Sequence, residues 1–260
     1  MNKKYIERAL SVLIILSLWQ LIAMGVGKTL IFPSPISSLA AVFDILAQGS
    51  SLKAIYVTFL RVLNAFAIST VCGIAIGFIM HFYAFTKIVF SPLLRIVQTA
   101  PVMSFIMLAL LWIETNSVAV FVGLLIGLPI MATATLKGLN AIDPNLIIMS
   151  DFFEVQRYKK LKYLYMPAIF PFLELAMKNA LSLTWKVCVA AEVLAYPQHA
   201  IGSQLINAKN LLETERLFAW TFLLIVLGVL SEYALKKLLM VYRLRRRKPK
   251  IERYDGELNA

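Results

Sequence analysis

Two charged residues lie inside a long apolar stretch of the chain, where charge is costly. Lys186 and Glu192 both belong to the stretch Phe172–Ala195. A charge at the centre of a bilayer costs at least about 2.5–3.5 kcal/mol on insertion scales, so such a group usually faces a water-filled cavity or a charged partner. Six residues of helix turn by about 240°, which places these two side chains on different faces. Lys186 is therefore expected to meet Glu114, Glu192 of another copy, or an anion.

The two charges differ in their depth along the stretch. Lys186 lies well inside it, and three roles remain open for its ammonium group: a structural ion pair, a contact to a substrate, or snorkelling toward the interface. Glu192 lies near the end of the stretch, where snorkelling or a role in a gate costs less free energy. The neighbouring Trp185 is typical of a packing or interfacial aromatic residue, with a ligand contact as the alternative.

Residue sets that support covalent or metal chemistry are absent from the sequence. Its two cysteines, Cys72 and Cys188, both lie in apolar segments, and its two histidines stand far apart. No HExxH or GxSxG motif occurs. The run Gly27-Lys28-Thr29 looks like the end of a phosphate-binding loop, but position 22 holds isoleucine where that loop requires glycine. We therefore expect that this chain is not an enzyme and binds no metal and no cofactor.

The composition is typical of a helical membrane protein. Of 260 residues, 60% are apolar and 15% are charged, and the mean hydropathy is +0.78; soluble domains have about 45–50% apolar and about 25% charged residues. The apolar stretches are long and unbroken, unlike the alternating strands of about ten residues in an outer-membrane barrel. The net charge of +12 includes a basic tail at residues 243–260. Because this tail directly follows an apolar segment, membrane lipid is expected beside it and nucleic acid is not.

Six apolar stretches are long enough, or nearly so, to cross a hydrocarbon layer of roughly 30 Å as helices. They are Ala9–Val26, Tyr56–Met80, Leu93–Ile113, Val118–Leu136, Phe172–Ala195 and Leu217–Val241. Most lysines and arginines fall on one side of these stretches, and the positive-inside rule then places both termini in the cytoplasm. We expect an all-α membrane protein of six transmembrane helices. It would form a single domain over residues 1–260, with its core at about 50–241.

Two connections between the stretches have patterns of their own. On the outer side, Gly27–Ile55 contains Phe32-Pro33-Ser34-Pro35, whose prolines end a helix, and then a pattern through Leu46 that suits a short surface helix. On the inner side, Lys137–Met166 is too polar to span a membrane. It combines a short apolar helical stripe with the basic run Arg157-Tyr-Lys-Lys-Leu-Lys. This inner loop is therefore expected to hold an amphipathic helix.

Two glycine pairs predict close helix packing. Gly73-x3-Gly77 and Gly123-x3-Gly127 each place two glycines on one face of a helix. Such spacing lets another helix approach closely in lipid and carries no information about a substrate.

The inner loop resembles the "EAA" segment of bacterial ATP-binding-cassette importer permeases. It has a helical pattern near Ile148–Phe153, then the basic stretch, then Met166-Pro167-Ala168-Ile169-Phe170-Pro171. Further motifs resemble the nitrate, sulfonate, taurine and bicarbonate branch of that family. These are Phe32-Pro33-Ser34-Pro35, Leu94-Arg95, Thr99-Ala100-Pro101, Leu111-Trp112, Leu128-Pro129-Ile130, Lys137-Gly138, Asp143, Leu183-Thr184-Trp185 and Ala191-Glu192. Their order and spacing across most of the chain make the resemblance specific.

The resemblance implies a type I importer permease with the MetI-like fold, in a bacterial inner or plasma membrane. Two permease subunits, as a homodimer, would form the pathway, two cytoplasmic ATPase subunits would dock on the inner loops, and an extracytoplasmic binding protein would deliver a small solute. The implied ATPase-coupling residues are Ser150, Asp151, Phe152, Phe153, Glu154, Val155, Gln156 and Arg157, in a loop at about 137–166. The candidate pathway residues are Glu114, Trp185, Lys186 and Glu192.

The coupling loop departs from the family pattern at two places. Glu154 stands where the family usually has a loop glycine, and Ile148-Met149-Ser150 replaces Glu-Ala-Ala. A docking helix is still expected around Ser150–Gln156, with a different fine geometry. Phe152 and Phe153 would anchor the contact to the ATPase, because buried aromatic residues usually dominate interface energy. Two alternatives are that these rings pack beneath the membrane helices and that the loop lies on the inner leaflet.

The substrate and the driving force have alternatives as well. The resemblance and Lys186 favour an organic or inorganic anion of the sulfonate, nitrate or taurine type, although similar permeases also carry thiamine precursors. A secondary transporter driven by an ion gradient is the rival class. It would be expected to show internal repeats, broken helices at mid-depth and several acidic residues along a route, and no repeat is visible in this sequence.

Overall fold

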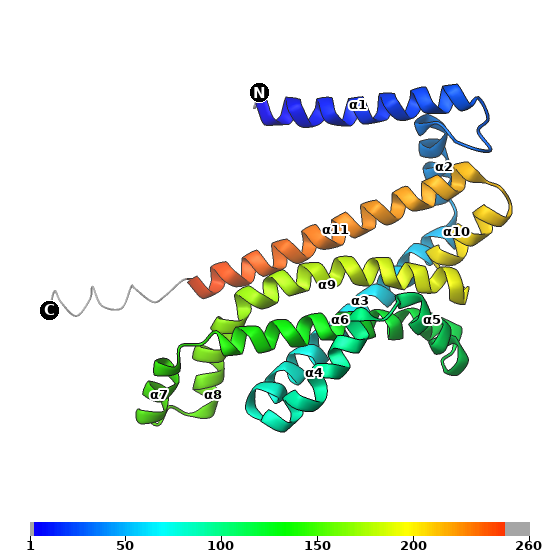
Figure 1. Cartoon of the computed structure of the whole chain (residues 1–260). Helices are drawn as coiled ribbons and strands as arrows, with labels where there is room; N and C mark the ends of the chain where they lie inside the picture. Colours follow the sequence, from blue (N-terminus) through cyan, green and yellow to red (C-terminus); the bar gives the residue numbers. More distant parts are fainter. Residues whose placement is uncertain (1–2, 248–260) are drawn as a thin grey trace.

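The computed structural model describes residues 3–247, and only helices are found in that part of the chain. In order, they are α1 (Lys3–Val26), α2 (Pro35–Ala47), α3 (Gly49–Phe82), α4 (Ala84–Thr99), α5 (Val102–Trp112), α6 (Thr115–Asn140), α7 (Pro144–Phe152), α8 (Arg157–Lys160), a π-helical turn (Leu161–Tyr165), α9 (Met166–Ala195), α10 (Ile201–Asn210) and α11 (Thr214–Arg247). The long helices α1, α6, α9 and α11 run roughly along one direction (Figure 1). The part of the predicted basic tail beyond Arg247 lies outside the described residues.

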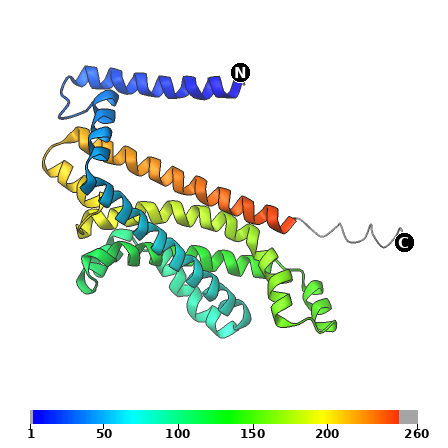
Figure 2. The same ribbon diagram turned by 180° about the vertical axis from the view of Figure 1, so that it is seen from behind.

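The bundle has two distinct ends. The helices α7 and α8 lie at one end, together with the N-terminal end of α1 and the C-terminal end of α11 (Figure 1). The helices α2 and α10 lie at the other end, and the view from behind shows the same separation (Figure 2). We call these the α7 end and the α10 end. Both ends of the described chain therefore lie on the same side as the inner loop.

The core of the bundle is made by α3, α6 and α9. The helix α6 packs along α3 on one side and along α9 on the other, and buried residues of all three share one apolar cluster. The helix α11 runs beside α9 with fewer contacts. The helix α1 stands apart and is anchored near its C-terminal end, where the indole of Trp19 donates a hydrogen bond to the carbonyl of Pro33 (3.0 Å).

Prolines and polar caps set several helix boundaries. The hydroxyl of Ser34 accepts a hydrogen bond from the backbone N–H of Ser37 (3.1 Å) and so caps α2, with Pro35 at its first position. This helix confirms the short helix predicted after the first apolar stretch. Its buried residues pack with α10 and α11 in a second apolar cluster at the α10 end.

The third predicted stretch is not one straight helix. The expectation of one continuous helix over Leu93–Ile113 was wrong, because α4 and α5 meet at 103° across Ala100 and Pro101, and whether the bent pair forms one span stays a prediction. Proline lacks the N–H needed to continue the helix, and the residue before it is pushed into an extended conformation. Ala100 has φ −70° and ψ 144°, as that restriction requires.

Three described helical segments are long and apolar enough to cross a membrane: α3, α6 and residues 214–243 of α11. The number is four if the bent pair α4 and α5 counts as one span. The helix α9 is not among them and carries four charged residues, Glu174, Lys178, Lys186 and Glu192. The other five predicted stretches are confirmed as helices, and the full set of six transmembrane spans stays a prediction.

The glycine pairs pack as predicted. A Cβ atom added at Gly73 would lie 2.8 Å from the backbone oxygen of Leu128 in α6, and one at Gly127 would lie 2.6 Å from the hydroxyl oxygen of Ser69 in α3. Distances this short leave no room for a methyl group, so backbone approaches backbone between these helices.

Replacing Gly73 by alanine is expected to destabilise the bundle by about 1–3 kcal/mol, because the new methyl group overpacks against the backbone of α6. Gly49→Ala at the start of α3 is the matched control, since a Cβ there meets nothing within 4 Å. Thermal unfolding of the purified protein in detergent measures both. Equal unfolding temperatures for the two variants would contradict the packing seen here.

Candidate functional site

The inner loop begins with a capped helix. The carboxylate of Asp143 accepts a hydrogen bond from the backbone N–H of Asn145 (2.8 Å), and Pro144 occupies the first helical position. The loop sequence thus specifies where α7 starts. The cap residue Asp143 comes soon after the last residue of α6, Asn140, so α7 begins directly where the chain leaves the core.

The helix α7 ends in a left-handed turn at Glu154, whose φ is 49°. The backbone N–H of Val155 donates to the carbonyl of Ser150 (3.0 Å), and the N–H of Glu154 donates to the carbonyl of Asp151 (3.0 Å). This pair of bonds is the Schellman motif, which most often has glycine at the left-handed position. The chain therefore makes, with glutamate, the turn that the resemblance assigns to a loop glycine.

The docking helix is shorter than predicted. A helix was expected around Ser150–Gln156, but α7 stops at Phe152 and the next helix, α8, begins at Arg157. The reason is the left-handed residue Glu154, which ends the helical hydrogen-bond pattern. The segment is therefore a helix–turn–helix tip, and an ion pair between Lys160 of α8 and Asp151 of α7 joins its two arms.

Two phenylalanines are exposed at this tip. The side chains of Phe152 and Phe153 are 81% and 67% exposed, and their rings meet edge to face with centroids 5.4 Å apart. The alternative that they pack beneath the helices of their own chain is wrong. Of the eight predicted coupling residues, all except the half-buried Ser150 and Val155 are exposed. An exposed aromatic pair on an ordered tip is typical of a surface that binds another protein.

Glycine at position 154 should make the tip more stable. A non-glycine residue in the left-handed region costs about 1 kcal/mol or more. Removing this strain with Glu154→Gly should make opening of the turn rarer, so hydrogen exchange of the backbone amides at positions 154 and 155 is expected to slow by about fivefold. Glu154→Ala is the control, because it removes the carboxylate and keeps the Cβ atom. Exchange that slows equally in both variants would assign the effect to the charge of Glu154 and contradict a backbone origin.

A second feature is a groove of about 500 Å³ between α9 and α11. Two of the predicted pathway residues, Trp185 and Lys186, line it. Trp185 is largely buried, and its indole donates a hydrogen bond to the hydroxyl of Ser231 in α11 (2.7 Å). Lys186 is exposed to the groove. The remaining walls are mostly apolar and include Val189, Ala190, Leu224, Ile225, Gly228 and Val229.

The groove also contains a residue that the sequence pattern did not single out. Glu232 of α11 lines it and is exposed. The signal was present, because Glu232 is a carboxylate inside the apolar stretch Leu217–Val241. Of the other two predicted pathway residues, Glu114 is exposed in the turn before α6, and Glu192 lies elsewhere in the fold.

Glu192 is completely buried, with 0% exposure, and is paired within its own chain. Its carboxylate forms an ion pair with the guanidinium of Arg61 in α3 (2.9 Å). The hydroxyl of Thr58 lies 2.9 Å from both carboxylate oxygens, and the backbone N–H of Gly202 donates to the carboxylate (3.2 Å). Of the two roles left open for Glu192, snorkelling toward an interface is therefore wrong, because other parts of the chain satisfy its charge. The expectation that Lys186 meets Glu192 of another copy is wrong for the same reason.

This buried cluster joins four elements near the α10 end. Besides pairing with Glu192 of α9, Arg61 donates to the amide oxygen of Asn116 in α6 (3.2 Å) and to the carbonyl of Gln198 (3.4 Å). The backbone N–H at the first residue of α10, Ile201, donates to the hydroxyl of Thr58 (3.0 Å). Arg61 could have been found from the sequence as a lone positive charge in the apolar stretch Tyr56–Met80.

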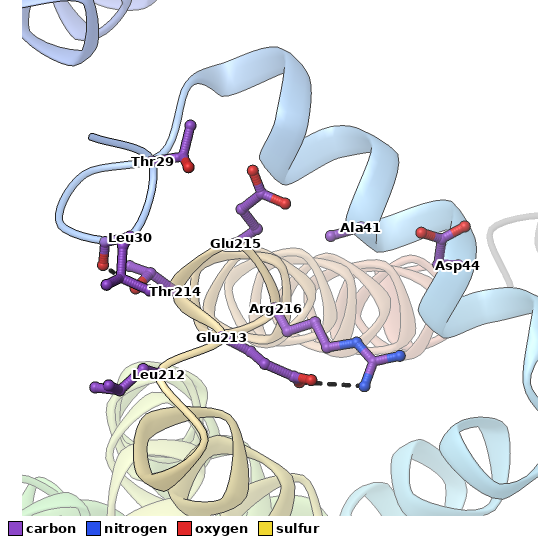
Figure 3. Close-up of a pocket in the computed structure, with 9 residues that line it drawn as sticks. All are labelled: Thr29, Leu30, Ala41, Asp44, Leu212, Glu213, Thr214, Glu215 and Arg216. Carbon is purple, nitrogen blue, oxygen red and sulfur yellow. Dashed lines mark hydrogen bonds and ion pairs between the residues drawn. The ribbon is translucent and has the colours of Figure 1, made fainter. Parts of the chain in front are cut away.

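The outermost part of the α10 end is hollowed (Figure 3). A cavity of about 350 Å³ lies between the α1–α2 connection, α2 and the start of α11. Asp44, Glu213 and Glu215 line it, and Glu213 pairs with Arg216 (3.2 Å). The hydroxyl of Thr214, the first residue of α11, donates a hydrogen bond to the carbonyl of Leu30, so the start of α11 is joined to the α1–α2 connection beside this cavity. The sequence pattern gave no reason to single out these residues.

Comparison with known proteins identifies the same class as the sequence motifs. Residues 69–239 match the model of a family described as "Binding-protein-dependent transport system inner membrane component". A putative aliphatic sulfonates transport permease protein, SsuC of Bacillus subtilis (strain 168), is 22% identical over 222 residues, which cover 84% of this chain and 80% of that protein. The nitrate import permease protein NrtB of Synechocystis sp. is 24% identical over 203 residues, or 74% of this chain and 73% of that protein.

A solved structure has the same fold. A chain from inward-facing conformations of the MetNI methionine ABC transporter superposes with a TM-score of 0.62 at 15% sequence identity. The match covers 73% of this chain and 94% of that one. The likeness extends the sequence comparison to the arrangement of helices in space.

Proposed function

The chain belongs to the binding-protein-dependent transport system inner membrane component family, and on that premise we propose that it forms the solute pathway of an ATP-binding-cassette importer. It is a multi-pass protein of the inner membrane, and it is not itself an enzyme, because ATP hydrolysis in such importers belongs to a separate subunit. The partners that we propose are a second copy of this chain, two ATPase subunits and an extracytoplasmic binding protein. Both termini would then be cytoplasmic.

The single observation that carries the proposal is the exposed tip between α7 and α8. Phe152 and Phe153 protrude from an ordered turn that the Schellman bonds and the Lys160–Asp151 ion pair hold. Placing large apolar rings in water is unfavourable, and an aromatic pair of this kind fits a pocket on a protein partner. We propose that the ATPase subunits bind this tip, with the residues from Ser150 to Arg157 as the contact.

The mechanism follows from the position of the tip. When two ATPase subunits close around ATP, the tips bound to them move together, and the helices attached to the tips turn as rigid bodies. We propose that this movement opens the pathway toward the α10 end and that release after hydrolysis opens it toward the α7 end. This chain would form the pathway and transmit the movement of the tips to it, and the ATPase subunits would supply the free energy from ATP.

We propose that the solute passes along the α9 face, where Trp185 and Lys186 line the groove. A lysine ammonium there favours an anion, and relatives named for sulfonate and nitrate transport point to the same class. Glu114 lies in the turn that precedes α6 and would contribute at the mouth. The buried Glu192 would act through the elements that it joins.

Purification of the tagged full chain from its native membrane in detergent tests the proposal. We expect an ATPase to co-purify, and proteoliposomes containing the complex should take up solute only with ATP inside and the binding protein outside. Uptake that follows an ion gradient without any ATPase would overturn the proposal in favour of a secondary transporter. Binding of sulfonates, nitrate, taurine and thiamine precursors to the cognate binding protein would identify the substrate.

A further inference from the structure

Two opposite charges face the groove between α9 and α11 without a partner in the described part of the chain. Lys186 and Glu232 are both exposed and line the same cavity, and neither forms an ion pair with a described side chain. The nearby charges of α9 are already used, since Glu192 pairs with Arg61 and Glu174 pairs with Lys178. A charge that faces lipid without a partner is unfavourable, so each of these two groups needs water or an opposite charge.

The wall of the groove also has an unfilled position at Gly228. A Cβ atom added there would meet nothing within 4 Å, whereas the paired glycines Gly73, Gly77, Gly123 and Gly127 inside α3 and α6 are packed tightly against their own chain. Glycine inside a helix is less favourable than alanine, so its presence on an open face needs a reason. In membranes that reason is commonly the close approach of another helix, and the neighbouring Ala190 is small as well.

From these two observations we propose that the groove is the face on which a second copy of this chain packs. In this arrangement Lys186 of one copy lies opposite Glu232 of the other, since both charges face the groove, and the two-fold axis forms the same ion pair a second time, because a symmetric interface that brings residue i to residue j also brings j to i. Without solute the two charges then neutralise each other twice and Gly228 lets the α11 helices approach, and a solute anion on the α9 face would compete with Glu232 for the Lys186 ammonium. This rests on the proposed pairing of permease subunits and names the surface and the ion pairs that hold it.

A charge-reversal experiment with two differently tagged full chains tests this arrangement. A pair of Lys186→Glu chains would bring carboxylates together, and a pair of Glu232→Lys chains would bring ammonium groups together. A mixed pair restores both ion pairs across the interface. When the two variants are co-expressed and recovered through each tag separately, the amount of the other tag counts the mixed pairs, and we expect these to exceed same-variant pairs by at least about tenfold, since like charges across an interface repel.

The other outcomes are distinguishable. An ion pair within one chain would be broken equally in every combination, so mixed and same-variant pairs in random proportions would overturn the proposal, as would loss of pairing in the mixed combination. Lys209→Glu on the exposed surface of α10 is the matched control and should leave the proportions random. Gly228→Leu is a second variant that should prevent pairing without changing charge. Co-purification of the ATPase, measured on the same samples, separates failure of this interface from failure of the importer function.

Discussion

Replacing Phe152 and Phe153 together by aspartate is expected to abolish ATP-dependent uptake. The two rings are the most prominent apolar groups of the tip, and each such anchor contributes about 2 kcal/mol or more when buried in a partner. Losing both would weaken docking by about a thousandfold, because each 1.4 kcal/mol is a factor of ten. Co-purification of the ATPase and uptake into proteoliposomes should fall together.

The control for this experiment keeps the tip apolar. Phe152→Leu with Phe153→Leu retains apolar contact area, so docking should weaken and persist. Neither pair of substitutions touches the core, since both rings lie outside it, and the amount of folded protein should stay the same. Full uptake by the double aspartate variant, with its ATPase still bound, would show that the importer is coupled elsewhere.

Arg61→Ala is expected to destabilise the fold by about 3–5 kcal/mol. The substitution leaves the carboxylate of Glu192 fully buried with no opposite charge, and an uncompensated buried charge is among the most damaging changes in a protein. Thermal unfolding in detergent measures the loss. Removing the charge from the other side as well should recover part of the stability, because Arg61→Ala with Glu192→Gln leaves a neutral amide that still has Thr58 and Gly202 beside it.

The wild type, Arg61→Ala, Glu192→Gln and the double variant form a double-mutant cycle. We expect the two substitutions to be strongly non-additive, with an interaction energy in the range of about 0.5–3 kcal/mol or above. Additive losses would mean that the ion pair does not contribute as the short distance suggests. A third variant, Arg61→Lys, keeps the charge and loses the fork that reaches Glu192, Asn116 and Gln198 at once, so its loss should be intermediate.

Local signals predicted most of the helices. Pro35, Pro144 and Pro167 each stand in the first turn of a helix, and five of the six apolar stretches each lie within a single helix. The exception follows from the same chemistry, because Pro101 interrupts the third apolar stretch and separates α4 from α5. The short helical segment between α6 and α9 was predictable as well, since its apolar stripe, basic run and terminal proline are all close in sequence, while its role in coupling stays a prediction.

The contacts of the charged residues were not predictable in the same way. Arg61 and Glu192 are separated by 131 positions, and no local pattern states that the folded chain brings them to 2.9 Å. Helix periodicity alone placed Lys186 and Glu192 on different faces, and the structure agrees, but periodicity does not tell which face is buried. The left-handed turn at Glu154 had a partial signal, since only the family pattern marked that position as one that favours glycine.

The route by which the tip joins the bundle has a mechanical consequence. Helical backbone continues without a coil from Arg157 through α8, the π-helical turn and α9 to Ala195. Near the far end of this continuous helix, the carboxylate of Glu192 forms an ion pair with Arg61 and accepts a hydrogen bond from the first turn of α10. A rotation that the proposed ATPase partner imposes at the α7 end would therefore be transmitted through continuous helix to Glu192, 35 residues later, at the α10 end. A substitution that makes any part of this helix flexible should uncouple ATP hydrolysis from opening of the pathway.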